Sequence, residues 1–394
     1  MTLRPAICLL VLAAFCGAEA LALEIGRPFG SHMVLPMQRE VPIWGKANPG
    51  APIELDFRGQ SFRTHASKAG DWRLVLPAME ASDKPATLTI KSGERSLKLD
   101  DLLIGRVFLC SGQSNMDFAL NRAIGGAQEA KRADKFPAIR LCNLTGVPTD
   151  ARNYDKTTLA RLNERDHFTG SWQVASEKSA AAFSAIAWWT GEAIHEQQKV
   201  PIGLVENAVG GSTTEAWLPR NLLASRKGYA GLLGQGWLSS KQISPWARGR
   251  AQQNLGSHLT ANHPFKPGFL FESGVRPWCG FPFDGVLWYQ GESNAEIADD
   301  AWNRTLITDL VKGWRKELGQ AKLPFYLVQL PRIGGNQPIR QHWPEYRKVQ
   351  AEMARSLPGV HLVITQDLGW DSPDVHPPDK LPVARRVAEA VLKN

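Results

Sequence analysis

Residues 107–118 read VFLCSGQSNMDF, and this stretch decides how the rest of the chain is interpreted. The apolar run from Ile104 to Cys110 predicts a fully buried strand. It ends in small, polar, turn-forming residues, after which residues 116–120 are expected to open a helix. Open α/β sheets place their ligand crevice at the carboxyl ends of parallel strands. Ser114 therefore lies where a nucleophile would find backbone N–H groups that bind negative charge, unless the serines of this turn only cap the helix.

The first 22 residues have the features of a secretory signal peptide. Arg4 gives a positive start, residues 7–15 are apolar, and residues 18–20 and 20–22 are small-x-small cleavage sites. We therefore expect a secreted or periplasmic protein that is not attached to a membrane after cleavage. A membrane anchor is the alternative, but the apolar run is too short to span a bilayer comfortably.

Composition excludes several classes of function. The net charge is +8, but the basic residues are scattered, so no nucleic-acid interface is expected. Three of the five cysteines follow residue 22, which permits at most one disulfide, and no Cys/His spacing indicates a metal site. The fourteen tryptophans are many, and we expect roughly two thirds in the core and leave the others open as platforms for sugar rings.

Two regions with different patterns of predicted secondary structure follow the signal peptide. Residues 23–103 contain short β-rich runs separated by turns, which predicts a small all-β, sandwich-like module. From residue 104 strands alternate with helices, which predicts a three-layer α/β domain over 104–394 with a mostly parallel sheet. Its expected strands are 104–110, 201–205, 285–290, 324–330 and 360–365, and its expected helices are 180–198, 301–318, 345–356 and 381–392. Residues 226–283 show no clear periodicity, and their role stays open.

Polar or glycine-rich turns end four segments of the α/β region: GQSNM at 112–116, GGS at 210–212, QGESN at 290–294 and DVHP at 374–377. In a parallel sheet such turns gather at one edge. Acyl transfer to a serine needs a nearby base, and histidine suits this role because its pKa lies near the working pH. Ser114 and His376 are therefore the predicted nucleophile and base. The backbone N–H of Ser114, one from Gly210 or Gly211, and a side-chain amide after the third strand are the predicted oxyanion donors.

These motifs resemble the sialate O-acetylesterase family, which belongs to the SGNH (GDSL-like) hydrolases. The resemblance is carried by GQSNM at 112–116, VGGSTTEAW at 209–217, WYQGESN at 288–294 and the DLG…DVHP run at 367–377, and it covers nearly the whole mature chain. It implies a secreted carbohydrate esterase with an SGNH-like domain that removes acetyl groups, typically from sialic acids, without metal or organic cofactor.

The resemblance also implies roles for individual residues. Ser114 is the nucleophile, and His376 is the general base and then the general acid. Gly210 or Gly211 matches the second oxyanion donor. Gln290 or Asn294 matches the third donor, and Gln290 is favoured. The residues expected to support these turns are Gln113, Asn115 and Glu292.

One position departs from the family pattern. Many SGNH enzymes have an aspartate three residues before the histidine, and here that place is Pro373. Asp374 is the favoured residue to orient His376, with Asp371 or a backbone carbonyl as alternatives. An orienting carboxylate fixes the histidine tautomer without taking the proton itself.

Three alternatives concern the substrate and the class of protein. The same chemistry would serve an acetyl ester on xylan or another plant glycan. A non-catalytic secreted sugar-binding protein would keep the fold, and a lipase-like enzyme would need an apolar lid that the sequence does not show. A cation in the site, for which Arg276 and Arg332 are candidates, would favour an acidic sugar.

Overall fold

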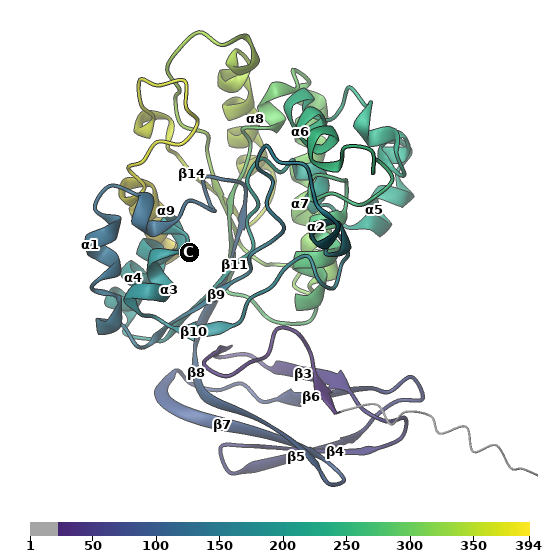
Figure 1. The fold of residues 1–394 in the computed structure, drawn as a ribbon. Helices are drawn as coiled ribbons and strands as arrows, with labels where there is room; N and C mark the ends of the chain where they lie inside the picture. Colours follow the sequence, from purple (N-terminus) through teal and green to yellow (C-terminus); the bar gives the residue numbers. More distant parts are fainter. Residues whose placement is uncertain (1–22) are drawn as a thin grey trace, which may run out of the picture.

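The structure is a computed structural model that describes residues 23–394 (Figure 1). The predicted signal peptide lies outside the described residues. A β-rich part, residues 23 to about 100, lies at one end of a larger α/β part (Figure 1). No helix within residues 23–394 has the length and apolar character needed to span a bilayer.

The amino-terminal part contains two small sets of strands. One is antiparallel in the order β1-β3-β6, and the other joins β4, β5, β7 and the first half of β8. Alternate residues of β6, Trp72, Leu74 and Leu76, are buried, as expected for strands with one face on a core. The strand bounds are β1 Glu24–Ile25, β2 Val34–Pro36, β3 Val41–Lys46, β4 Pro52–Phe57, β5 Gln60–His65, β6 Asp71–Leu76, β7 Ser82–Ser92 and β8 Arg95–Gly112.

The larger sheet confirms the predicted α/β architecture. Its strand order is β10-β9-β11-β8-β12-β13-β14, and every neighbouring pair is parallel except β10 and β9. The bounds are β9 Ile139–Asn143, β10 Trp172–Val174, β11 Ile202–Glu206, β12 Gly285–Tyr289, β13 Phe325–Val328 and β14 Val360–Val363.

Helices cover both faces of this sheet, so the α/β part has three layers, with the sheet in the middle (Figure 1). Val286 and Trp288 of β12 belong to the core shared with α7 and α8, whereas Leu287 and Tyr289 belong to the core shared with α4 and α9. The helix bounds are α1 Gly126–Ala130, α2 Lys156–Ala160, α3 Glu177–Ala181, α4 Ala185–Gln198, α5 Arg220–Ser225, α6 Pro245–Leu255, α7 Asp300–Glu317, α8 Trp343–Ser356 and α9 Leu381–Lys393.

The structure contains elements that the sequence did not predict. Strands β9 and β10 were missed because both are short and lie beside polar loops. Helices α1, α2, α5 and α6 were also not predicted. The helix expected directly after Ser114 is wrong. The backbone N–H groups of Met116 and Asp117 both donate to the carbonyl of Gln113, so the chain forms a tight turn there, and a 3-10 turn, Leu120–Arg122, follows.

Strand β8 runs through both parts of the molecule. Its pairing with β7 shifts register between the pairs Ala86–Leu102 and Leu88–Leu99, which leaves one extra residue on β8, a β-bulge. Asp101 lies in this bulge with φ 58°, the left-handed region. The predicted boundary between residues 103 and 104 falls inside β8, just after the bulge, and the domain division stays a prediction.

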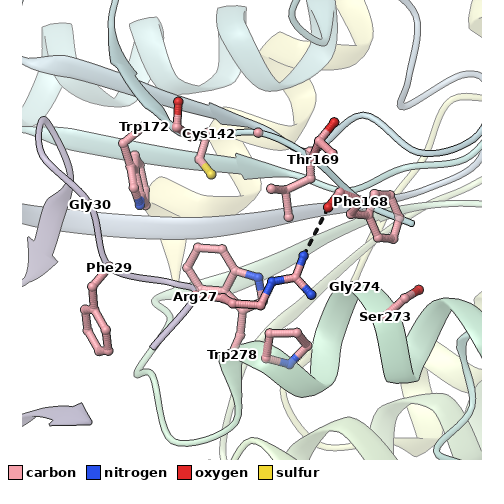
Figure 2. A pocket seen from close by; sticks show the side chains of 14 residues that line it. Arg27, Phe29, Gly30, Cys142, Phe168, Thr169, Trp172, Ser273, Gly274 and Trp278 are labelled. Atoms are coloured by element: carbon pink, nitrogen blue, oxygen red, sulfur yellow. Dashed lines mark hydrogen bonds between the residues drawn. The ribbon is translucent and has the colours of Figure 1, made fainter. Parts of the chain in front are cut away.

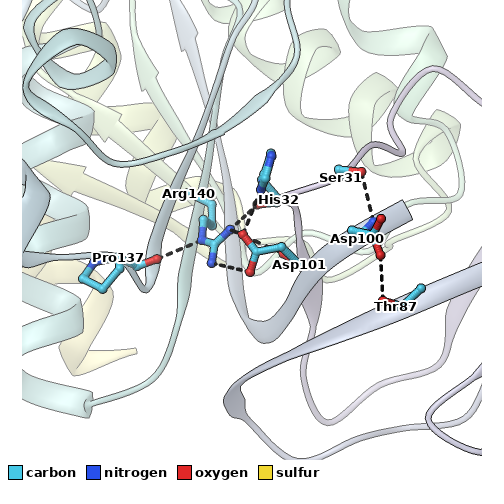
Figure 3. Close-up of polar contacts among 7 residues, drawn as sticks. All are labelled: Ser31, His32, Thr87, Asp100, Asp101, Pro137 and Arg140. Atoms are coloured by element: carbon cyan, nitrogen blue, oxygen red, sulfur yellow. Dashed lines mark hydrogen bonds and ion pairs between the residues drawn. The ribbon is translucent and has the colours of Figure 1, made fainter. Parts of the chain in front are cut away.

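Asp101 and Arg140 link the two parts at this bulge (Figure 3). Arg140 of β9 is buried, and its Nη2 donates to Asp101 Oδ1 at 3.0 Å. Its Nε donates to the carbonyl of Pro137 at 2.9 Å, and Nδ1 of His32 lies 2.8 Å from Asp101 Oδ2. Nη1 of Arg140 also donates to Asp101 Oδ2, so the pair is bidentate. A bidentate guanidinium–carboxylate pair fixes both the direction and the distance between its partners.

A small cavity of about 150 Å³ also lies at this junction (Figure 2). Phe29, Trp172 and Trp278 form aromatic walls, and Nη2 of Arg27 donates to the carbonyl of Phe168 at 3.0 Å. None of its lining residues belongs to the pocket that contains Ser114.

Candidate active site

Ser114 lies two residues beyond the end of β8, in a turn pressed against β12. Gly112 adopts φ 136°, and a Cβ added there would lie 2.0 Å from the carbonyl oxygen of Tyr289. The backbone N–H of Gln113 donates to the same oxygen at 3.0 Å. The position therefore requires glycine, both for its conformation and for the close approach of the two backbones.

His376 reaches Ser114 from the loop before α9. Its Nε2 lies 2.7 Å from Ser114 Oγ, and its Nδ1 lies 2.7 Å from Asp374 Oδ1. With the Nδ1 proton directed at the carboxylate, Nε2 is left to accept the serine proton. Asp371 is not part of this arrangement, because its Oδ1 pairs with Nη1 of Arg332 at 2.7 Å.

The glycine turn after β11 lies beside the serine. A Cβ added to Gly210 would lie 3.6 Å from Ser114 Cβ, and both residues line the same pocket. Within residues 23–394, the backbone N–H groups of Ser114 and Gly210 donate to no acceptor. These two N–H groups are therefore free to bind an oxyanion. Gly211 adopts φ 76° and packs against Trp246 instead.

Gln290 and Asn294 are brought near these turns but do not line the pocket. Nε2 of Gln290 donates to Asn294 Oδ1 at 2.6 Å, and its Oε1 accepts from the hydroxyl of Thr214 at 2.7 Å. Nδ2 of Asn294 donates to Oε2 of Glu215 at 3.1 Å. Both amides are thus engaged in a buried network. Their N–H groups donate to other side chains and do not reach the pocket, so the role of a third oxyanion donor stays a prediction.

Asn115 connects the serine turn to the histidine loop. Its Nδ2 donates to the carbonyl of Val375 at 2.9 Å and also to Glu292 Oε1. The buried amine of Lys380 donates to Asn115 Oδ1. Because Asn115 follows Ser114 and Val375 precedes His376, one side chain ties together the backbones that carry both groups.

Burial changes the ionisation of the charged members of this network. It raises the pKa of Glu292 and lowers the pKa of Lys380 to about 7. Sequence reasoning missed Lys380, since a single lysine before a helix carries no local signal.

Gln113 supports the turn at residues 290–294, because its Oε1 accepts from the backbone N–H groups of Gly291 and Ser293, each at 3.4 Å.

The pocket around Ser114 has a volume of about 390 Å³. The cations that line it are Arg122 and Arg340, whereas Arg276 and Arg332, the cations considered from the sequence, do not. Arg276 pairs with carboxylates elsewhere. The other lining residues are Gln113, Ser114, Asp117, Phe118, Thr149, Asp150, Gly210, Gly211, Trp246, Glu292, Ser293, Glu296, Val375 and His376.

The described residues contain no cluster of three or more His, Cys, Asp or Glu side chains arranged to hold a metal ion. Cys110, Cys142 and Cys279 are free thiols.

Comparisons with known proteins find similarity to carbohydrate esterases. A family model described as "Carbohydrate esterase, sialic acid-specific acetylesterase" matches residues 273–393, which contain Asp374 and His376. Human sialate O-acetylesterase is 26% identical over 377 residues, covering 88% of this chain, and the mouse enzyme is 25% identical, covering 97% of this chain. These matches support membership of the sialate O-acetylesterase family. The chain spans 65% of the length of the human protein and 75% of the mouse protein.

A solved structure extends the similarity with known esterases to the fold. The carbohydrate acetylesterase from Xanthomonas citri is 26% identical, with a TM-score of 0.73, and the match covers 94% of this chain and 74% of that protein. The family model begins after Ser114 and Gly210, so the matches to whole proteins are the ones that include the serine and glycine turns.

Proposed function

We propose that this protein is a secreted carbohydrate O-acetylesterase, most specifically a sialate O-acetylesterase. The observation that carries the proposal is the contact of 2.7 Å between His376 Nε2 and Ser114 Oγ, with Asp374 on the other ring nitrogen. A serine hydroxyl is a poor nucleophile until a neighbouring base accepts its proton, and this arrangement supplies that base. The esterase chemistry of the named relatives agrees with it.

The reaction proceeds by two acyl transfers. Ser114 Oγ attacks the acetyl carbonyl while His376 Nε2 accepts its proton, and the backbone N–H groups of Ser114 and Gly210 bind the oxyanion. His376 returns the proton to the sugar oxygen as the C–O bond breaks. Water then attacks the acetyl-serine with His376 again as base, which releases acetate and restores the serine. Each oxyanion donor is worth about 3–4 kcal/mol of barrier.

Beside the acidic side chains Asp117, Asp150, Glu292 and Glu296, the pocket holds two cations that would bind an acidic sugar, Arg122 and Arg340. Both line the pocket, and Nη1 of Arg340 lies 3.7 Å from Glu296, whereas the guanidinium of Arg122 lies 4.8 Å from the ring centre of Phe118. A cation near the ester attracts the carboxylate of a sialic acid. The human and mouse relatives are named for sialate esters. The alternative substrate is an acetylated plant glycan such as xylan.

The proposal also includes the place and organisation of the chain. A signal peptide over residues 1–22 would direct the protein to the periplasm or outside the cell. Residues 23–103 would form a structural β-module, and residues 104–394 would form the esterase domain. The β-bulge at Asp101 lies next to this division, which falls within the continuous strand β8.

Acetate release tests the proposed function. The purified protein is assayed with O-acetylated sialic acid and with acetylated xylan, beside Ser114→Ala, His376→Ala and the control Ser61→Ala on the exposed strand β5. Wild type and control are expected to release acetate, fastest from sialic acid, and the two site variants to lose at least about 10³-fold in kcat. Faster release from xylan would change the substrate, and an unchanged rate in Ser114→Ala would refute the nucleophile. Sugar binding without any acetate release would indicate a non-catalytic sugar-binding protein.

A further inference from the structure

Trp246 differs from the other tryptophans of this protein in its exposure. All fourteen lie within the described residues, and eleven of them are buried. Trp44 and Trp370 are partly buried, whereas Trp246 is 39% exposed. An indole with apolar surface exposed to water lacks the stabilisation that burial would give. An exposed tryptophan in a pocket is therefore a candidate for ligand binding.

Trp246 lies on a wall of the pocket that contains Ser114 and His376. It belongs to α6, within residues 226–283, whose role the sequence left open. A Cβ added to Gly211 would lie 2.3 Å from Cζ3 of Trp246, so the edge of the indole rests on the glycine turn. The indole thus packs on Gly211, the residue that follows Gly210, and Gly210 adjoins Ser114.

The indole is held in place from several sides. The buried ring of Phe265 has its centroid 5.9 Å from that of Trp246. The guanidinium carbon of Arg250 lies 5.3 Å from the indole centre, and Nη1 of Arg250 donates to the carbonyl of Thr149 at 3.4 Å. Ser244 caps α6 by accepting from the N–H of Ala247 at 3.1 Å. A preorganised side chain loses little conformational entropy when a ligand packs on it.

We propose that Trp246 stacks on the sugar ring of the acetylated substrate and selects sugar esters over simple alkyl esters. This inference rests on the proposed function and adds its recognition element. The C–H face of a pyranose ring is apolar, and a flat aromatic surface removes it from water without a hydrogen-bonding requirement. The ester would then lie at Ser114 while the ring lies on the indole. Trp246 is a specificity residue in this scheme and takes no part in proton transfer.

The test compares two kinds of ester in Trp246→Ala, Trp246→Phe and the control Leu259→Ala, which alters an exposed apolar residue of the same segment outside the pocket. For Trp246→Ala, KM for the acetylated sugar is expected to rise about ten-fold, while kcat/KM for ethyl acetate stays within about two-fold of wild type. Trp246→Phe should restore most of the sugar KM, and Leu259→Ala should match wild type.

An equal loss on both esters would assign Trp246 a purely structural role and overturn the inference. So would an unchanged sugar KM in Trp246→Ala with acetate release intact, a result that leaves the esterase proposal standing. Calorimetric titration of the deacetylated sugar into Ser114→Ala, with and without Trp246→Ala, gives a readout independent of catalysis. Weaker binding in the double variant supports the inference even if no ester is hydrolysed, and equal binding contradicts it.

Discussion

Asp374 Oδ1 binds His376 twice, through Nδ1 at 2.7 Å and through the backbone N–H at 3.1 Å. The two residues are separated by one position, so the carboxylate orients the ring and also fixes the local backbone. Asp374→Asn is expected to lower kcat roughly a hundred-fold, because the amide no longer selects the tautomer with an unprotonated Nε2. The loss should be smaller than that of Ser114→Ala, because the Asp374 side chain is 54% exposed and water can replace part of its effect.

Asp371→Asn is the matched control for this prediction. Asp371 pairs with Arg332, its side chain is 88% exposed, and it does not touch His376. Its variant should retain wild-type kcat for acetate release. A large loss in Asp371→Asn with little loss in Asp374→Asn would reverse the assignment of the orienting carboxylate.

Asn115 is expected to act as a positioning residue. Asn115→Asp keeps the size of the side chain and an acceptor for Lys380. It can donate neither to the carbonyl of Val375 nor to Glu292, whose carboxylate it would face with a second carboxyl group. We expect kcat to fall about ten-fold with KM nearly unchanged, since the histidine loop loses its link to the serine turn. Steady-state kinetics with circular dichroism as a check of folding measure this. Wild-type kcat in a folded Asn115→Asp would show that the Val375 bond does not position His376.

His263 predicts a loss of stability in acid. Burial lowers its pKa to about 3 from an ordinary value of 6.5, and its Nδ1 accepts from the backbone N–H of Phe265 at 3.0 Å. As the pH falls below 6.5, the unfolded chain binds a proton that the folded protein binds only near pH 3, so the free energy of unfolding decreases. Between pH 6.5 and about 4.5 the decrease from this group is on the order of 2–3 kcal/mol.

Urea unfolding at several pH values checks this decrease. His263→Gln should be less stable than wild type at neutral pH but should lose less stability on acidification. The exposed His258→Gln serves as control and should follow the wild-type curve. Parallel pH dependence in wild type and His263→Gln would mean that other groups cause the acid sensitivity.

Gly112 and Gly249 should respond in opposite ways to alanine. A Cβ at Gly112 would lie 2.0 Å from the carbonyl oxygen of Tyr289, and its φ of 136° is unfavourable for other residues, so we expect Gly112→Ala to cost more than about 2 kcal/mol. Gly249, inside α6, has no atom within 4 Å of an added Cβ. Gly249→Ala should stabilise the protein by about 0.5–1 kcal/mol. Thermal or urea unfolding compares the two, and a neutral Gly112→Ala would show that β8 and β12 can move apart.

The sequence alone predicted most of the regular structure of the α/β part. The five expected strands correspond to β8, β11, β12, β13 and β14, because buried parallel strands are continuous apolar runs. Strands β9 and β10 escaped prediction because neighbouring strands, and not their own short sequences, specify them. The turn after Ser114 has the composition of a helix start. The N–H groups of Met116 and Asp117 donate to the carbonyl of Gln113, so the chain forms a tight turn there and no helix follows directly.

The sequence by itself determined which residues can perform the chemistry, since a serine, a histidine and a glycine pair at strand ends follow from local patterns. Only the tertiary structure decided that Nε2 of His376 meets Ser114 Oγ across 262 positions and that Asp374 rather than Asp371 contacts the ring. It also brought the buried amine of Lys380 to Asn115 and left Trp246 exposed on the pocket wall. The physical reason is that burial and side-chain contacts depend on how distant segments pack, whereas strand and turn patterns depend on a few consecutive residues.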